Sequence, residues 1–161
     1  MKNIFKFAAM AFAAVVMFAS CDSKDDDAPK ATIEKQWEAE FGYAWDFGTT
    51  TKNQVYYTMP SMGEENAETG KIDLMAMPLG TILEIVETDA TSGVIKVEAD
   101  SFDEEYNPIK VQGEIPYKDL TINSVSVDMG ITSGCQPTGE WLELKAMDAS
   151  KYNWVPMQME M

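Results

Sequence analysis

Arginine and histidine are absent from this 161-residue sequence, in which every one of the 12 basic residues is a lysine. Without histidine, neither a Ser-His-Asp nor a Cys-His catalytic arrangement can form, and the commonest ligand of zinc and copper is missing. Without arginine, the planar clamp that binds phosphates and carboxylates through two hydrogen bonds is also missing. We therefore expect no enzyme, no cofactor and no metal site.

Positive charge is scarce as well, because 27 acidic residues outnumber the 12 lysines and give a net charge of −15. Two of those lysines, Lys2 and Lys6, lie in the first few residues, so the rest of the chain is more acidic still. Such a surface repels the phosphates of nucleic acids and the headgroups of anionic lipids. We expect no nucleic acid partner, and any membrane attachment must rest on something other than the charge of the protein surface.

The N-terminus has the order of a secretory signal. Lys2 and Lys6 precede an uninterrupted apolar run from Phe7 to Phe18, and the small residues Ala19 and Ser20 follow. A helix of this length is about 18 Å long, whereas the hydrocarbon core of a bilayer is roughly 30 Å thick. The run is therefore too short for a transmembrane anchor, and residues 1–20 are predicted to be a signal peptide.

The end of this segment carries more specific information. Phe18-Ala19-Ser20-Cys21 resembles the lipobox of bacterial lipoproteins. The resemblance implies that the signal is cut before Cys21, that the Cys21 thiol receives a diacylglyceryl group, and that the new amino terminus is acylated. Two or three acyl chains anchor a protein firmly, because each buried methylene contributes roughly 0.8 kcal/mol. The only other cysteine, Cys135, is then left without a disulfide partner in the chain.

An acidic run follows the predicted lipid anchor and consists of Asp22, Ser23, Lys24, Asp25, Asp26 and Asp27. It resembles the export signal of Bacteroidota-type surface lipoproteins, which implies an outer-membrane protein exposed on the cell surface. A solvated, flexible tether is the alternative reading of such a run, and the two readings are compatible. Residues 21–31 are assigned to this lipidated tether, and a periplasm-facing location remains open.

Residues 32–161 are predicted to form a single β-rich domain. Its first segment, Thr32 to Phe41, has apolar residues four apart and is read as a short helix. Further along, apolar residues alternate with polar ones, which indicates seven to nine short antiparallel strands. Pro78 and Pro116 are expected to end two of these strands, and a shift in the apolar phase predicts a bulge near Asn123 or Ser124.

Strands of this kind form either a closed barrel or a two-sheet β-sandwich. The segments Lys35-Gln36-Trp37, Trp45-Asp46-Phe47-Gly48 and 115–121 resemble lipocalin-like lipoproteins. The resemblance implies a small up-and-down barrel that binds a small, mostly apolar ligand. It also implies that Trp37 or Trp45 closes one end of the barrel, with a lysine such as Lys145 packed against that tryptophan.

Aromatic residues are the best binding candidates, and those selected are Trp37, Trp45, Tyr56, Tyr57 and Trp141. They could line a pocket or a sugar-binding face, and packing in the core is the competing interpretation. Two functions remain open. One is a cell-envelope binding or accessory module for a small apolar ligand or glycan. The other is a structural lipoprotein or adhesin that binds an envelope protein. A cavity of several hundred Å³ inside the barrel would favour the first, and a filled interior the second.

Overall fold

A computed structural model describes residues 30–128 and 136–158. From Ala31 onward the chain forms one compact β-rich unit. Its elements, in chain order, are β1 (Gln36–Glu38), β2 (Ala44–Phe47), β3 (Gln54–Thr58), a 3-10 turn η1 (Pro60–Met62), β4 (Glu64–Glu65), β5 (Ile72–Glu87), β6 (Gly93–Phe102), β7 (Pro108–Lys118), β8 (Ser124–Asp128), β9 (Trp141–Ala146) and β10 (Tyr152–Pro156).

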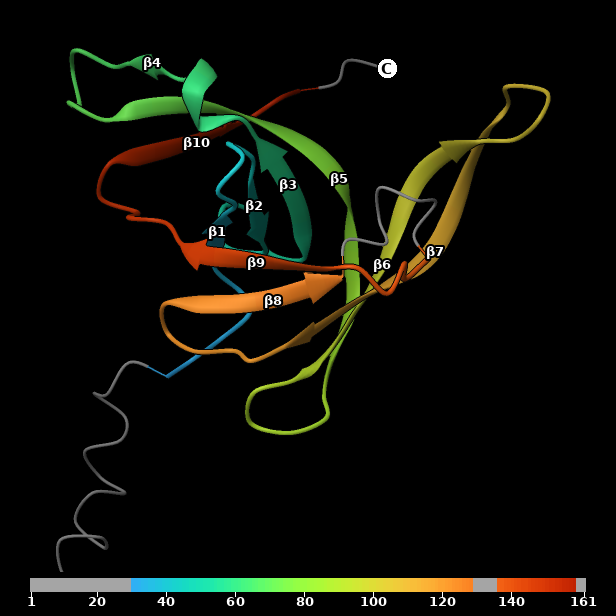
Figure 1. Cartoon of the computed structure of the whole chain (residues 1–161). Coiled ribbons are helices and arrows are strands. Elements are labelled where there is room, and N and C mark those ends of the chain that lie inside the picture. The colour runs from blue at the N-terminus through green and yellow to red at the C-terminus, as the bar shows by residue number, and fades with distance from the viewer. Residues whose placement is uncertain (1–29, 129–135, 159–161) are drawn as a thin grey trace, which may run out of the picture. The chain divides into compact units, whose positions relative to one another are not determined.

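Eight of these strands close into an antiparallel barrel (Figure 1). Each of β1, β2, β3, β5, β6, β7, β8 and β9 pairs with the next one along the chain, and β9 returns to β1. Closure rests on the pairing of Trp37 with Ala146 and of Glu38 with Lys145. A closed meander leaves no free edge in the barrel itself. The predicted small antiparallel barrel is confirmed, and the two-sheet sandwich is not formed.

The short helix predicted for Thr32 to Phe41 is wrong. Residues 33–35 form bends, and Gln36–Glu38 is strand β1. In β1, Trp37 pairs with Trp45 of β2 on one side and with Ala146 of β9 on the other. The four-residue apolar spacing fits a helix, but the strand lets the backbone form hydrogen bonds with two neighbours, and tertiary pairing outweighs a weak local preference.

Neither proline ends its strand. β5 continues through Pro78 because its register against β3 shifts between Val55 and Tyr56, which leaves Leu79 as an extra residue beside the proline. A bulge is one of the few places where a sheet accepts a proline, because the missing N–H is not needed there. β7 continues through Pro116 to Lys118, since β8 pairs with β7 only at Tyr117 and Lys118 and needs no donor from Pro116.

The predicted bulge near Asn123 or Ser124 is instead a turn that precedes β8. The Thr121 side chain accepts hydrogen bonds from the backbone N–H groups of Asn123 at 3.1 Å and of Ser124 at 2.9 Å. The apolar phase shifts at this point because the chain reverses direction, and alternation begins again with β8.

The strand alternation divides the apolar residues between two cores. The barrel interior contains Ile33, Trp37, Ala39, Trp45, Phe47, Val55, Ile82, Ile95, Val97, Ala99, Ile115, Tyr117, Leu120, Val125, Val127 and Leu144. A smaller core lies outside the barrel wall, where β10 pairs in parallel with the first half of β5. It contains Ala44, Tyr56, Leu74, Ala76, Met147 and Trp154.

The barrel has two distinct ends. The near end holds residues 31–35, where the described chain enters, and the turns 48–53, 88–92 and 119–123. Two contacts join these segments, from Lys35 Nζ to the Ile122 carbonyl at 2.6 Å and from the Leu120 N–H to the Thr91 carbonyl at 2.9 Å. The distal end holds the turns 39–43 and 103–107 and the β3–β5 connection, because antiparallel strands alternate in direction.

Two buried aspartates organise loops at the barrel rim. Asp46 accepts hydrogen bonds from the N–H groups of Thr49 at 2.7 Å and Thr50 at 3.0 Å, which shapes the turn after β2. Asp128 accepts them from Thr138 at 2.9 Å and Gly139 at 2.6 Å. Burial pushes the pKa of Asp128 upward, but these hydrogen bonds outweigh burial and hold the pKa below its ordinary value.

Candidate functional site

The five aromatic residues selected from the sequence are not brought together into one pocket. Trp37 and Trp45 lie in the barrel core, and Tyr57 packs against it from β3. Tyr56 points to the opposite face of the same strand and belongs to the outer core. Trp141 is exposed, with Lys118 Nζ lying 4.2 Å from its ring centre. Neighbouring strand residues point to opposite faces, so Tyr56 and Tyr57 could not share a site.

Trp37 lies towards the near end of the barrel and is completely buried. Its indole N–H donates a hydrogen bond to the Ile33 carbonyl at 3.0 Å. Lys35, rather than Lys145, is the lysine beside it, with Nζ 5.6 Å from the ring centre. Lys145 points outward and its Nζ lies 3.3 Å from a carboxylate oxygen of Glu40. The cation comes from a residue two positions away because Lys35 lies directly before β1 at the near end, where its Nζ also donates a hydrogen bond to the Ile122 carbonyl at 2.6 Å.

Large side chains fill the described part of the barrel interior. Trp37, Phe47, Ile95, Ile115 and Leu144 are all fully buried there. Interiors packed in this way leave few voids larger than a water molecule. Three hollows on the described part of the chain each include exposed side chains, so these three open on the surface.

A cluster of three aromatic rings lies at the distal end, and we call Phe41, Tyr43 and Trp45 the distal aromatic cluster. Tyr43 stacks on Trp45 with ring centres 6.2 Å apart, and Phe41 meets Tyr43 at 5.6 Å and Trp45 at 6.4 Å. Trp45 is buried in the barrel core, whereas Phe41 and Tyr43 are exposed. The cluster therefore joins the core to the surface and holds two exposed rings in fixed positions.

A tight turn positions this cluster. The Gly42 N–H bonds to the Ala39 carbonyl at 3.2 Å, and the Ala39 N–H bonds to the Tyr43 carbonyl at 2.8 Å. Gly42 has φ +87°, a conformation that favours glycine. A turn of this type followed by one left-handed residue is a common connection between paired strands. It aligns Tyr43 with Trp45 and leaves Phe41 at the tip.

A groove of about 250 Å³ runs beside the cluster, between the 39–43 turn and β9. Its lining residues are Glu40, Phe41, Leu142, Glu143 and Lys145. Glu40 and Lys145 form the ion pair described above, and both side chains are exposed. The groove thus combines an aromatic ring with two carboxylates and one ammonium group, which together can contact an apolar face and accept or donate hydrogen bonds.

Phe41 and Tyr43 were not among the binding residues selected from the sequence. Phe41 ends the segment for which the apolar spacing predicts a helix, yet it is 60% exposed. Gly42, which directly follows that segment, supplies the left-handed residue of a strand connection. A glycine between two alternating aromatic segments, Trp37 to Phe41 and Tyr43 to Phe47, was the signal that could have indicated a hairpin.

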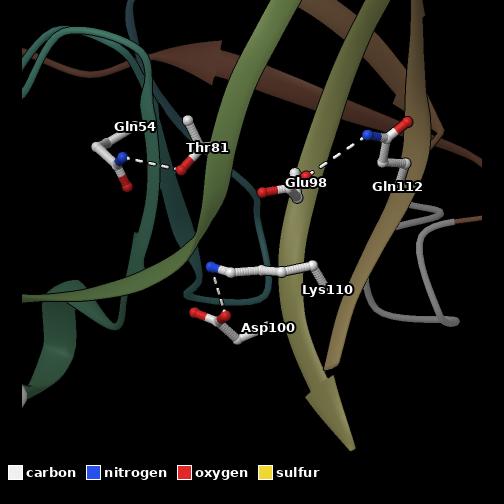
Figure 2. Close-up of polar contacts among 6 residues, drawn as sticks. All are labelled: Gln54, Thr81, Glu98, Asp100, Lys110 and Gln112. Carbon is white, nitrogen blue, oxygen red and sulfur yellow. Dashed lines mark hydrogen bonds and ion pairs between the residues drawn. The ribbon is translucent and has the colours of Figure 1, made fainter. Parts of the chain in front are cut away.

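The hairpin of β6 and β7 is a second exposed feature, and it extends beyond the rest of the barrel (Figure 1). Its outer face carries cross-strand polar contacts, from Lys110 Nζ to Asp100 at 2.6 Å and from Gln112 to Glu98 at 3.5 Å (Figure 2). The contact between Gln54 and Thr81 at 3.1 Å joins β3 and β5 in the same view. These contacts link neighbouring strands on the outer surface.

The tip of this hairpin is ordered by Asp103. Its carboxylate accepts hydrogen bonds from the Asn107 side chain and from the N–H groups of Asn107 and Glu105, and the Asn107 side chain is the main reason that the Asp103 pKa lies below its ordinary value. Tyr106 has φ +63° and is 85% exposed, and Phe102 is 66% exposed. The tip therefore holds two aromatic side chains in solvent.

A third exposed feature is an apolar patch on the outer side of β5 and β10. It surrounds a hollow of about 470 Å³ lined by Met62, Glu64, Asp73, Met75, Val155, Pro156 and Met157. Met75 and Val155 are exposed because they alternate with Leu74 and Trp154, which point into the outer core.

The residues of the predicted lipid anchor and export signal, Cys21 and 22–27, lie outside the described residues, as does Cys135. Within residues 30–128 and 136–158, no helix is long and apolar enough to cross a membrane. The same residues contain no group of three or more acidic or cysteine side chains arranged to hold a metal ion.

The fold and the surface together define an up-and-down barrel whose described interior is filled and whose distal end carries the exposed rings of Phe41 and Tyr43. No protein-family model, curated protein or solved structure matches the chain.

Proposed function

We propose that this protein is a lipoprotein of the bacterial outer membrane, anchored through Cys21, and that its barrel is a non-enzymatic accessory module that binds its ligand on the outer surface. The lipobox-like ending and the acidic run 22–27 support the anchor and the surface location. The lack of histidine supports a binding role rather than catalysis.

The filled barrel interior is the observation that favours a ligand site on the outer surface over one inside the barrel. A small apolar ligand needs an internal cavity of roughly 300–1,000 Å³. In the described part of this barrel that space holds Trp37, Phe47, Leu144 and their neighbours. Residues 31–35 begin the barrel domain at the near end, and the exposed rings of Phe41 and Tyr43 lie at the opposite, distal end.

Binding to an envelope protein is the second candidate function, and the β6–β7 hairpin favours it. A hairpin that projects from the barrel with Phe102 and Tyr106 exposed resembles a contact surface more than a solvated loop. Tyr106 stays in a left-handed conformation that costs a non-glycine residue roughly 1–2 kcal/mol. Such strain is found more often at functional positions than elsewhere.

Acylation provides the test of the anchor. Cells expressing the protein are labelled with a radioactive fatty acid, and the Cys21→Ser variant is compared with the parent chain. We expect the parent chain to carry the label and to sediment with the outer membrane, and the variant to lose both properties. Label retained on the variant would show that the lipid, if present, is attached elsewhere. Cys135→Ser is the matched control and should be labelled like the parent.

Surface exposure is tested separately with the acidic run. Replacing Asp25, Asp26 and Asp27 with alanine should leave acylation intact and reduce cleavage by a protease added to whole cells. The physical reason is that an export signal is read by its negative charge directly after the anchor. Equal cleavage of parent and variant would mean that the run serves only as a solvated tether.

The location of the ligand is tested with a fluorescent fatty acid as an apolar probe. A filled barrel should show no saturable uptake of this probe, whereas a barrel with a ligand cavity should take up one molecule for each chain. Saturable uptake that is lost when Leu144 is replaced by the larger tryptophan would place the ligand inside the barrel and would overturn the proposal.

A further inference from the structure

We propose that Phe41, Tyr43 and the groove beside them form a binding subsite for a neutral sugar ring. This inference rests on the proposed function, because it requires a ligand on the outer surface of the distal end. It adds the chemical class of that ligand and the residues that contact it.

The aromatic rings supply the first requirement of a sugar site. A pyranose ring has C–H groups on its faces, and these pack against an aromatic ring that is exposed and held in place. Phe41 is exposed at the tip of the turn, and its ring contacts Tyr43 and Trp45 at centre distances of 5.6 Å and 6.4 Å. Because Trp45 belongs to the barrel core, Phe41 is supported from below and loses little freedom on binding.

The polar groups of the groove supply the second requirement. Hydroxyl groups lie around the edge of a sugar ring and both donate and accept hydrogen bonds. The carboxylates of Glu40 and Glu143 are acceptors, and the ammonium group of Lys145 is a donor. Lys145 Nζ lies 3.3 Å from Glu40, so the pair can exchange its mutual contact for contacts with sugar hydroxyls. Both groups are exposed, which keeps the cost of that exchange low.

Charge and size narrow the ligand further. The chain has a net charge of −15 and the groove has two carboxylates against one ammonium group, so uronic acids and sulfated sugars are repelled. The groove volume of about 250 Å³ lies below the range of pockets for drug-sized ligands. These properties fit one neutral sugar ring, with the rest of a glycan outside the groove.

The binding experiment uses the full chain with Cys21→Ser, labelled with ¹⁵N, and the methyl glycosides of glucose, galactose, mannose and N-acetylglucosamine as probes. We expect at least one of them to cause saturable shifts in the amide signals of residues 39–43 and 142–145. Methyl glucuronide should cause weaker shifts, because its carboxylate meets the acidic groove. Millimolar affinity is expected for a single sugar ring on an exposed surface.

Two variants separate the site from unspecific effects. Phe41→Ala should weaken binding about tenfold, which corresponds to the loss of one stacking contact. Phe102→Ala is the matched control, because Phe102 is exposed to a similar degree but lies on the β6–β7 hairpin, and it should bind the glycoside like the parent. Phe41→Trp retains an aromatic face and should preserve binding. Unchanged thermal melting of the variants confirms that their fold is intact.

The inference is overturned if no neutral glycoside causes saturable shifts, or if Phe41→Ala binds as tightly as the parent. Either result leaves the proposed function standing, provided that the chain is acylated at Cys21 and excludes the fluorescent fatty acid. Conversely, saturable uptake of the fatty acid that Leu144→Trp abolishes would overturn the proposed function even if a sugar also shifted residues 39–43. Shifts confined to the β6–β7 hairpin would contradict the assignment of the site to Phe41.

Discussion

Replacing tryptophan with phenylalanine is expected to have different effects on stability at two buried positions, Trp37 and Trp154, because their indole N–H groups differ in hydrogen bonding. Trp37 and Trp154 are 0% and 6% exposed, so each is part of a packed core. The Trp37 N–H donates to the Ile33 carbonyl at 3.0 Å, whereas the Trp154 N–H has no hydrogen-bond partner among the described residues. Phenylalanine removes the N–H at either position while keeping an aromatic ring.

The expected magnitudes follow from this difference. Both substitutions remove similar apolar volume from a core, which costs roughly 1–2 kcal/mol. Trp37→Phe also loses a hydrogen bond worth about 0.5–1.5 kcal/mol, and the Ile33 carbonyl keeps its second donor, the Lys35 N–H. In the parent, the buried Trp154 N–H costs about 1–3 kcal/mol because it lacks a partner, and Trp154→Phe removes this cost. We therefore expect Trp37→Phe to destabilise the domain by about 2–3 kcal/mol and Trp154→Phe to be nearly neutral.

Urea unfolding followed by circular dichroism measures both values, since a domain of this size has only about 5–15 kcal/mol of stability in total. The slope of each transition should equal that of the parent, so that a change of midpoint reports stability alone. Trp141→Phe is the control, because this exposed side chain should change the midpoint little. Equal destabilisation by Trp37→Phe and Trp154→Phe would refute the reasoning, because the hydrogen bond would then carry no measurable energy.

Three further predictions concern the loops and turns. Asp128→Asn should lower the free energy of unfolding at pH 7. In urea melts, the difference from the parent should shrink as the pH falls below about 4, because folding lowers the pKa of Asp128 and its carboxylate stabilises the fold only above that lowered pKa. Tyr106→Gly should raise stability by about 0.5–1 kcal/mol, because glycine adopts the positive φ without strain and Tyr106 buries little surface; a lower urea midpoint would contradict this. Gly93→Ala should cost about 1–3 kcal/mol of stability, because the new Cβ would overlap the Val86 carbonyl and the Tyr117 hydroxyl. Adding Tyr117→Phe should recover part of this loss in a thermal melt, and no recovery would argue against the overlap with the Tyr117 hydroxyl.

The class of fold was predictable because strand alternation is a local property. Tyr43, Trp45 and Phe47 alternate with Ala44 and Asp46, and each set lies on the face that a period of two predicts. The same period of two is seen in β3, where Val55 and Tyr57 face the barrel core and Tyr56 faces the outer core. Composition also determined which side-chain chemistries are available, because no fold can supply an imidazole or a guanidinium group to a chain without histidine and arginine.

Three-dimensional pairing decided the rest. Trp37 lies in a strand rather than a helix because β2 and β9 both offer it backbone partners, and β9 is about a hundred residues away in the sequence. β5 passes through Pro78 because the register of β3 shifts beside it. Exposure of Phe41 and burial of Trp45 depend on where a turn meets the barrel rim, which apolar spacing does not encode. Local alternation thus determined the strands, and only long-range hydrogen bonding decided which aromatic residues fill the barrel and which face solvent.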